Sequence, residues 1–419
     1  MVRVFMRRHY EPILLFLLGS VLFDYIRRWI KVINFMSESI PIANVELERR
    51  RLRLENLPAR HIAKMMKMLG DEMRIQVEIE PVWQHFGCVT RTDGTKTYFR
   101  GAHFDLNGMG SMEVAVDKGF ASHFLQQAGF NVIPGKTFYA PQFAESLLSG
   151  DSVDAAYQHA KNNVGFPVVL KPNTASQGRL VCVANDRRTF MQAARAITKI
   201  DKVFLVQPLV EGHDYRIVVL DGEVLSAYER LPLTVTGDGM STIDQLLCAK
   251  QEDFELRGRD TKIQTNDFRI SNRLRRYKMT RATVLPMGSA FALLDNKNLS
   301  SGGEAVDATA DIHPSYATLA AKIVKTMGLR YCGLDLMVQD DIRKPLHAEK
   351  NSYQVIEINS APGVDHYGES GDKQNRIVAE IYRKILIALA GRTSGDVLPV
   401  QQTIPVELKH GRLYAPEDF

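Results

Sequence analysis

Two neighbouring segments alternate aliphatic residues with oxygen-bearing side chains, and this alternation limits what the chain can fold into. In QVIEINSAPG (354–363), Glu357 and Asn359 stand two residues apart and alternate with Ile356 and Ile358. Residues two apart in a strand point to the same face of the sheet. The pattern predicts a strand whose two isoleucines face a core while a carboxylate and an amide oxygen face a site.

The segment YCGLDLMVQD (331–340) repeats this arrangement. Leu334, Leu336 and Val338 form one face of a predicted strand, and Asp335 points the other way. Because the two segments are close in sequence, we expect them to pair as a long hairpin. Three oxygen ligands on adjacent strands suit Mg²⁺, which takes a few protein oxygens together with substrate phosphates. The alternative interpretation is that these are the solvated polar faces of ordinary strands.

A third segment, GFPVVLKPNTASQGRLVCV (165–183), reads as strand, loop and strand. Lys171 ends an apolar run, and a Ser-Gln-Gly turn precedes the next one. Glycine and small polar residues let backbone N–H groups approach phosphates, and a lysine adds a point charge. The segment lacks the Walker pattern, and its turn does not lead directly into a helix as a dinucleotide fingerprint does. The choice therefore lies between a phosphate-covering flap and a plain hairpin with a surface lysine.

The next segment, 204–230, predicts a second hairpin. Strands at 215–220 and 223–230 are joined by an Asp-Gly pair, a strong signal for a tight turn. Asp214 and Arg216 lie on one face of the first strand, and Arg230 ends the second.

In this order, the pieces resemble the ATP-grasp superfamily, and most closely the ATP-grasp module of cyanophycin synthetases and bifunctional glutathione synthetases. The similarity covers about residues 116–390. It implies an α/β (α+β) fold in which two α+β subdomains grip ATP, after an N-terminal α/β region. The motifs that carry it are EGHDYRIVVLDGEVL (211–225), VTGDGMSTIDQLL (235–247), NLSSGGEAVDATADIHP (298–314), GLDLMV and VIEINSAPG.

The resemblance also implies roles for individual residues. By this resemblance, Lys118 and Lys171 would bind the phosphates of ATP, and Ser176, Gln177 and Gly178 would form the flap over them. Gln207 and Leu209 would contact adenine, and Asp214 would bind the ribose. Mg²⁺, or Mn²⁺ as an alternative, would be bound by Asp335, Glu357 and Asn359. Two arginines would bind phosphate or acyl phosphate in catalysis: Arg216 and Arg230. The acceptor substrate would meet Asn298, Ser301, Gly302 and Gly303.

The activity implied is that of an ATP-dependent carboxylate–amine ligase that works through an acyl phosphate on amino acids or peptides. The nucleotide motifs alone leave two alternatives open: an ATP-grasp kinase acting on a hydroxyl, and a non-catalytic nucleotide-binding protein. Gly333 stands where D-Ala–D-Ala ligases keep an arginine, which argues against that activity. The chain ends at Phe419, so we expect a stand-alone module without the Mur-ligase-like domain of a complete cyanophycin polymerase.

Composition fits a globular enzyme, with 45% hydrophobic and 24% charged residues. The net charge of +5 comes without a basic stripe interleaved with aromatics, so nucleic acid is not an expected partner. The four cysteines are far apart and form no C-x-x-C motif, which predicts reduced thiols and a cytoplasmic protein. The charged segment 251–280 predicts a helix and a mobile loop over the site. Its Arg273, Arg275 and Arg276 either bind an acidic substrate or form a solvated face.

We predict five regions along the chain: an apolar and basic helical segment (1–40), an N-terminal α/β domain (41–115), a small flap subdomain (116–205), a C-terminal subdomain with the metal site (206–395) and a tail (396–419). The apolar run at 13–23 is too short to span a bilayer comfortably. Packing on the protein body or on a second copy in a homo-oligomer is favoured for this segment over contact with a membrane surface.

Overall fold

The computed structural model describes residues 57–347, 352–392, 408–409 and 412–413. The predicted segment 1–40 lies outside the described residues, as does most of the predicted tail. The chain divides into two compact units, and the second one, residues 58–80 and 84–419, holds nearly all of the elements described below.

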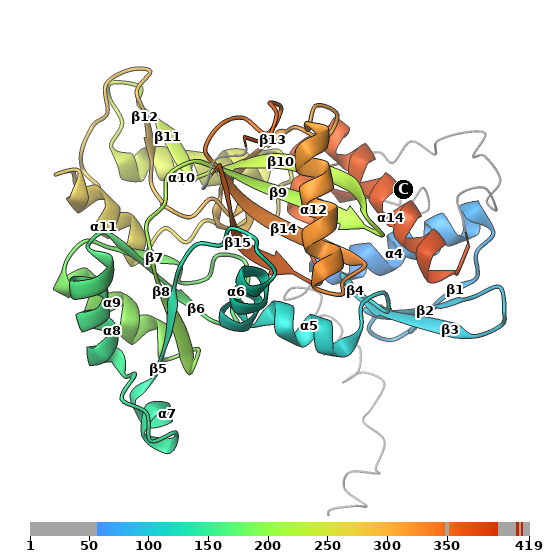
Figure 1. The fold of residues 1–419 in the computed structure, drawn as a ribbon. Coiled ribbons are helices and arrows are strands. Elements are labelled where there is room, and N and C mark those ends of the chain that lie inside the picture. The colour runs from blue at the N-terminus through green and yellow to red at the C-terminus, as the bar shows by residue number, and fades with distance from the viewer. Residues whose placement is uncertain (1–56, 348–351, 393–407, 410–411, 414–419) are drawn as a thin grey trace, which may run out of the picture. The chain divides into compact units, whose positions relative to one another are not determined.

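A five-stranded antiparallel sheet forms the centre of this unit (Figure 1). The strands, in spatial order, are β13 (Glu304–Asp307), β10 (Glu223–Leu231), β9 (His213–Leu220), β14 (Tyr331–Val338) and β15 (Tyr353–Asn359). Both predicted hairpins are confirmed, since β9 pairs with β10 and β14 with β15. Asp221 and Gly222 have φ values of 48° and 87°, the left-handed backbone that a tight primed turn requires.

One face of this sheet is apolar along its whole length. Leu334, Leu336 and Val338 are fully buried there, as predicted, together with Ile217 and Val219. Three helices pack against this face: α12 (Pro314–Thr326), which crosses the sheet in Figure 1, α6 (Lys118–Gln127) and α5 (Met109–Val116).

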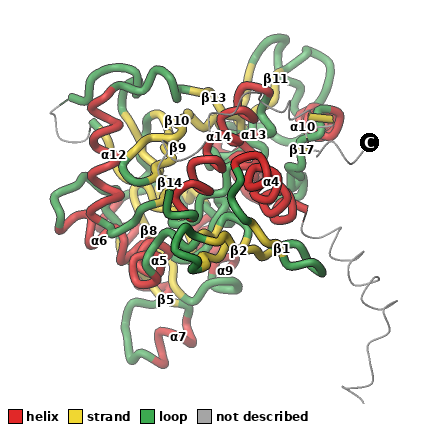
Figure 2. Tube along the Cα trace, turned by 90° about the vertical axis from the view of Figure 1, so that its right-hand side faces the viewer, coloured by secondary structure: helices red, strands yellow, loops and turns green. Residues whose placement is uncertain are grey.

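The opposite face is apolar at one end of the strands and charged at the other. At one end, Val218, Leu220 and Tyr331 share a core with α4 (Leu57–Met73) and α14 (Asp372–Leu389) (Figure 2). A small N-terminal sheet of β1 (Val77–Ile79), β2 (Phe86–Thr90), β3 (Lys96–Arg100) and β4 (His103–Phe104) joins the same core. At the other end, alternation brings charged residues to this face, and that end carries the site.

A β-bulge in β15 corrects one sequence prediction. Asp335 lies opposite Glu357, but the next pair is Leu336 with Val355, so Ile356 is an extra residue. Val355 is 4% exposed and takes the core position predicted for Ile356, which lines a cavity instead. Ile358 is buried as predicted. The alternation could not reveal the inserted residue.

A second, four-stranded sheet has the order β5 (Lys136–Tyr139), β8 (Val203–Pro208), β6 (Val168–Pro172) and β7 (Cys182–Ala184). Its core face packs against α8 (Val153–His159), a π-helix (Ala160–Val164) and α9 (Arg187–Ile197). Asp186 caps α9 by accepting a hydrogen bond from the Thr189 N–H. The residues between β6 and β7, 173–181, form the predicted loop, which we call the flap loop.

The remaining elements are α7 (Pro141–Ser146), β11 (Thr234–Thr236), α10 (Ile243–Leu256), α11 (Phe268–Arg276), β12 (Ala290–Ala292), a 3₁₀ turn (Leu299–Ser301), α13 (Asp365–Gly368), β16 (Leu408–Lys409) and β17 (Arg412–Leu413). Helix α6 begins at Lys118, and Gly129 follows its end with φ 84°.

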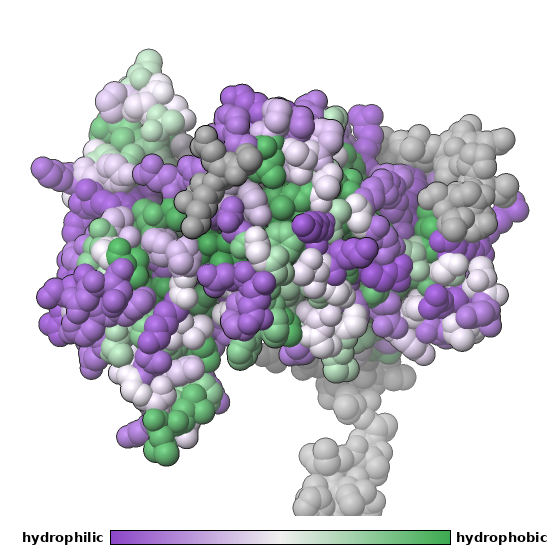
Figure 3. All heavy atoms as spheres, viewed as in Figure 1, coloured by the Kyte–Doolittle hydropathy of each residue, from purple (hydrophilic) through white to green (hydrophobic). Residues whose placement is uncertain are grey.

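Within the described residues, no helix is both long enough and apolar enough to cross a bilayer. Most of the surface in view is polar, but apolar side chains gather at the tip around α7 (Figure 3), where Leu148 is 96% exposed.

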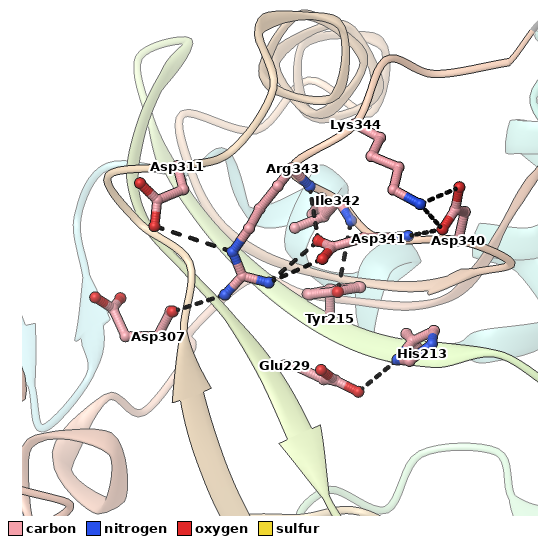
Figure 4. Close-up of polar contacts among 10 residues, drawn as sticks. All are labelled: His213, Tyr215, Glu229, Asp307, Asp311, Asp340, Asp341, Ile342, Arg343 and Lys344. Atoms are coloured by element: carbon pink, nitrogen blue, oxygen red, sulfur yellow. Dashed lines mark hydrogen bonds and ion pairs between the residues drawn. The ribbon is translucent and has the colours of Figure 1, made fainter.

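The loop after β14 is fixed by a half-exposed ion cluster (Figure 4). Arg343 Nη1 lies 3.1 Å from Asp341 Oδ1, and Arg343 Nη2 donates to the Asp307 carbonyl at 3.2 Å. Asp311 lies 3.9 Å from Arg343 Nε. This cluster sits at the end of the same strand whose middle carries Asp335.

Candidate functional site

A cavity of about 420 Å³ lies between the five-stranded sheet and the sheet of β5, β8, β6 and β7. In β6, Val168 and Leu170 enter the helical core, so Val169 and Lys171 face the cavity. Ten of the predicted site residues line it: Lys118, Lys171, Gly178, Gln207, Leu209, Asp214, Arg230, Asn298, Asp335 and Glu357.

The predicted metal ligands are brought together by strand register. Asp335 lies directly opposite Glu357, and Asn359 lies opposite Gly333. The Asn359 amide nitrogen is 3.3 Å from Glu357 Oε1, so these two side chains are adjacent on one face. The prediction of a shared site face for Asp335, Glu357 and Asn359 agrees with this geometry.

The two lysines come from different elements, and both contact strand β15. Lys118, the first residue of α6, lies 3.5 Å from Glu357 Oε2 and donates to the Ala175 carbonyl of the flap loop at 2.7 Å. Lys171 donates to the carbonyl of the bulged Ile356 at 3.3 Å. Burial lowers the pKa of Lys171 to about 8, although the charge of Glu357 acts to raise it. Both ammonium groups therefore stand between the two sheets.

Two arginines hold the buried Asp335. Arg230 Nη2 lies 2.9 Å from Asp335 Oδ2 and 2.7 Å from Asp214 Oδ1, so it bridges the two aspartates. Arg216 Nη2 donates to Asp335 Oδ2 at 3.2 Å, and Arg216 Nε forms an ion pair with Oδ1. The side chains of Asp335 and Arg230 are 1% and 5% exposed, so these charges are almost fully removed from water.

The charges shift the two carboxylates in opposite directions. Burial alone would raise the pKa of Glu357, but Lys118 and Lys171, followed by the two arginines, lower it to about 2. Burial raises the pKa of Asp335 to about 6, against the opposing effect of Arg216 and Arg230. Both values leave the groups ionised at neutral pH.

Gly333 makes room for one of these arginines. A Cβ built on Gly333 would lie 2.7 Å from Arg216 Nη1 and 2.7 Å from Pro362 Cβ. The glycine that argued against a D-Ala–D-Ala ligase therefore has a steric role here, because the guanidinium of the neighbouring strand fills the space above it.

The donor set suits a hard divalent cation. Two carboxylates and one amide supply oxygen ligands of the kind that Mg²⁺ prefers. In the described part of the chain, His, Cys, Asp and Glu alone form no cluster of three possible ligands, so the Asn359 amide would be needed to complete the set. Asp335 Oδ1 is buried and forms an ion pair with Arg216 Nε, so the arginine also orients this carboxylate.

Several predicted residues lie away from the cavity wall. Ser176 and Gln177 are exposed on the flap loop, while Arg216 and Asn359 act from behind the lining residues. Ser301, Gly302 and Gly303 form a turn. Gly302 and Gly303 are buried in it, and a Cβ on Gly303 would meet the Leu231 carbonyl at 2.5 Å. The turn carbonyls of Leu299 and Gly303 accept hydrogen bonds from the buried Arg259.

Other lining residues were not assigned to the site from the motifs, namely Arg179, Glu211, Asn296, Lys297 and Met337. Arg179 was visible as the fourth residue of Ser-Gln-Gly-Arg, and two of the others adjoin Asn298. Of the three arginines singled out in the charged segment, only Arg273 lines the cavity. Arg273 and Arg276 both pair with Asp295, whereas Arg275 is exposed. The segment itself is partly helical, as α10 and α11.

One family match covers the sheet of β5–β8, the flap loop and strands β9 and β10. Residues 124–257 match the RimK-like ATP-grasp domain. The bifunctional glutathione biosynthesis protein GshAB of Mannheimia succiniciproducens is 30% identical over 279 residues, 62% of this chain and 35% of that protein. Cyanophycin synthetase of Synechocystis is 34% identical over 268 residues, 61% of this chain and 28% of that protein. The chain thus spans about a third of the length of these curated relatives.

Among solved structures, the bifunctional glutathione synthetase of Pasteurella multocida aligns with 76% of this chain and 44% of its own, at 24% identity and a TM-score of 0.47. The family match and the curated relatives agree with the resemblance derived from the motifs, and the prediction of an ATP-grasp fold of the α+β class is confirmed.

Proposed function

We propose that this chain, which carries a RimK-like ATP-grasp domain, is an ATP-dependent ligase that joins a carboxylate to an amine. The observation that carries the proposal is the cavity between the sheets, where two lysines, two arginines and three oxygen ligands converge. Such a set can bind the triphosphate of ATP and stabilise the charge that develops during phosphoryl transfer.

ATP would lie between the β6–β8 face and the five-stranded sheet. Leu209 and the backbone at Gln207 would meet the base, because the end of β8 and the residue after it line the cavity. Lys118, Lys171 and the flap loop would hold the phosphates. The Gln207 side chain already donates to the Ile133 carbonyl at 3.0 Å, so its amide fixes the wall rather than the base. Asp214 is engaged by Arg230, and its second oxygen is the one that would accept a ribose hydroxyl.

Asp335, Glu357 and Asn359 would hold Mg²⁺, or Mn²⁺ in its place, and when bound the metal would neutralise charge on the phosphates. Arg230 faces the cavity and would meet the transferring phosphoryl group. Arg216 acts one layer behind it, where it holds Asp335 in place. The flap loop would exclude water, which otherwise hydrolyses an activated carboxyl group.

The proposed reaction has two steps. A substrate carboxylate oxygen attacks the γ-phosphorus of ATP, and ADP leaves, which gives an acyl phosphate. The amine then attacks the acyl carbon, loses a proton and expels phosphate, which retains one of the original carboxylate oxygens. Amino acids or peptides are the proposed substrate class, by analogy with the relatives named above, and a cytoplasmic location is proposed because ATP is the co-substrate.

The experiment that tests this proposal follows the acyl phosphate. With candidate amino acids, ATP and Mg²⁺, phosphate release should depend on both carboxylate and amine. Hydroxylamine in place of the amine should give a hydroxamate, and ¹⁸O from a labelled carboxylate should pass to the released phosphate. A stable phosphorylated product without an amide would instead identify a kinase. Binding of ATP without any turnover would identify a nucleotide-binding protein.

A further inference from the structure

Helix α11 connects two parts of the molecule that meet over the cavity. Its Ile270 and Leu274 are buried in a core formed with α10 and the β11–β12 strands. At its start, Phe268 packs instead against the core of the four-stranded sheet. Asn272 adds a hydrogen bond to Gln192 of α9 at 3.1 Å. The helix therefore braces the sheet that carries the flap loop.

One arginine of this helix reaches the flap loop itself. Arg269 Nη1 donates to the Gly178 carbonyl at 2.9 Å and to the Val181 carbonyl at 3.2 Å. A single guanidinium nitrogen thus holds two carbonyls of the loop, one on each side of Arg179. Arg269 does not line the cavity, so it acts on the loop from outside.

The orientation of Arg269 is fixed from its own helix. Asp267 caps α11 by accepting a hydrogen bond from the Arg269 N–H at 2.9 Å, and its other oxygen accepts from Arg269 Nε at 2.8 Å and Nη2 at 2.6 Å. The two side chains are 10% and 14% exposed, so this pair is largely shielded from solvent. The fork of the guanidinium leaves Nη1 directed at the loop.

Two neighbouring contacts support the same position of the loop. Ser300 Oγ donates to the Gln177 carbonyl at 3.2 Å. Gly178, with φ 65°, lies so close to the 296–298 segment that a Cβ on it would meet Asn298 Oδ1 at 2.2 Å. The flap loop is therefore seated on the C-terminal part of the molecule, with Gly178 and Arg179 at the cavity.

We propose that Arg269 is a positioning residue that keeps the flap loop seated over the cavity through the Gly178 and Val181 carbonyls. Seating sets the backbone of the loop and the position of Arg179, whose side chain forms no ion pair within the described residues and is available to an anionic ligand. The consequence for ATP and for exclusion of water rests on the proposed ligase function. The seating itself does not.

The test uses Arg269→Met, with Arg269→Lys as the conservative variant and Arg275→Met as the matched control. Arg275 is on the same helix, is exposed and does not line the cavity. Hydrogen exchange would be measured on the free protein for peptides covering 174–182 and, as an internal reference, 213–220. The Arg179 and Val181 amides bond within the loop at 3.1 and 3.2 Å, so opening of the loop exposes them.

In Arg269→Met, we expect exchange of the loop peptide to rise about tenfold, while the β9 peptide and the Arg275→Met protein stay at wild-type rates. Lysine should restore part of the protection. Unchanged loop exchange in Arg269→Met overturns the proposal. If that variant fails to fold, Asp267→Asn replaces it, because asparagine still caps the helix but holds the guanidinium weakly. An Asp267→Asn protein with wild-type loop exchange also overturns the proposal.

A second experiment tests whether the position of the flap loop affects turnover. If the wild type is a ligase, Arg269→Met should raise KM for ATP and increase phosphate release in the absence of amine, relative to release with amine. Failure of the wild type to use ATP would refute the proposed function and leave the exchange result to decide the role of Arg269.

Discussion

Two arginine–aspartate clusters, one in the middle of strand β14 and one just after its end, differ in their exposure to water. In its middle, Asp335 is 1% exposed and is held by Arg216 and Arg230. After its end, Arg343 and Asp341 are 33% and 39% exposed and fix a loop (Figure 4). Exposed pairs contribute little because water already solvates them, whereas burying charges is expensive and needs a compensating reason. The comparison suggests that the buried cluster is retained because the site needs its charges, and the exposed one because it fixes the conformation of the loop.

The largest effect is expected for Arg230→Met. The change leaves Asp214 and Asp335 without a shared buried partner, which should cost about 3–5 kcal/mol in the free energy of unfolding. Denaturant unfolding would measure it, with Arg330→Met as the control, since Arg330 forms a two-point pair with Asp221 that is nearly half exposed. Equal losses in the two variants would remove the distinction between buried and exposed clusters.

Next is Glu357→Gln, which should lower metal-dependent turnover by about 10²–10³-fold. The amide keeps the shape and the contact with Asn359 but loses the charge that pairs with Lys118. Steady-state kinetics across a magnesium titration would measure this, alongside the unfolding midpoint to show that the fold is kept. Near-normal turnover at ordinary magnesium concentrations would mean that the metal is held elsewhere.

Gly333→Ala should cost about 1–3 kcal/mol of stability and lower activity, because the added methyl group would overlap the Arg216 guanidinium and the Pro362 ring. Gly363→Ala is a useful control, since nothing lies within 4 Å of a Cβ built there. If Gly333→Ala is as stable and as active as that control, then the arginine moves without consequence and its position is not tightly set.

The smallest effect is expected for Arg343→Met, at about 0–1 kcal/mol, with turnover unchanged. Its partners remain solvated after the change, so no buried charge is left behind. A loss of activity comparable with that of Glu357→Gln would show that the loop after β14 is coupled to the site, and would contradict the contrast drawn between the clusters.

The sequence predicted those parts of the site that depend on strand alternation. Asp335, Glu357 and Asn359 could be placed on one face because a two-residue period is a local property of the chain. The ion pair between Arg230 and Asp214 could not be predicted in this way. The motifs assigned each residue separately to a ligand, and they carried no information about contacts between strands. The β9–β10 register, which opposes Asp214 and Arg230, fixes that contact. The bulge at Ile356 was hidden for the same reason.

Arg269 shows a different limit. Its partners, Gly178 and Val181, lie about ninety positions earlier in the chain, and both contribute only backbone carbonyls. Any residue offers a carbonyl, so no residue type at 178 or 181 marks the contact in the sequence. Such contacts depend on how α11 packs, which a local pattern does not report.

The bulge in β15 has a consequence for how this strand can vary in evolution. Lys171 uses the carbonyl of Ile356 and not its side chain, so position 356 should accept many aliphatic residues. Loss of the residue is another matter. Deleting Ile356 would close the bulge. Val355 and Tyr353 would keep their core side by simple alternation from Glu357, but Lys171 would lose the carbonyl that accepts its hydrogen bond. In this stretch, selection should therefore preserve the number of residues more strictly than their identity.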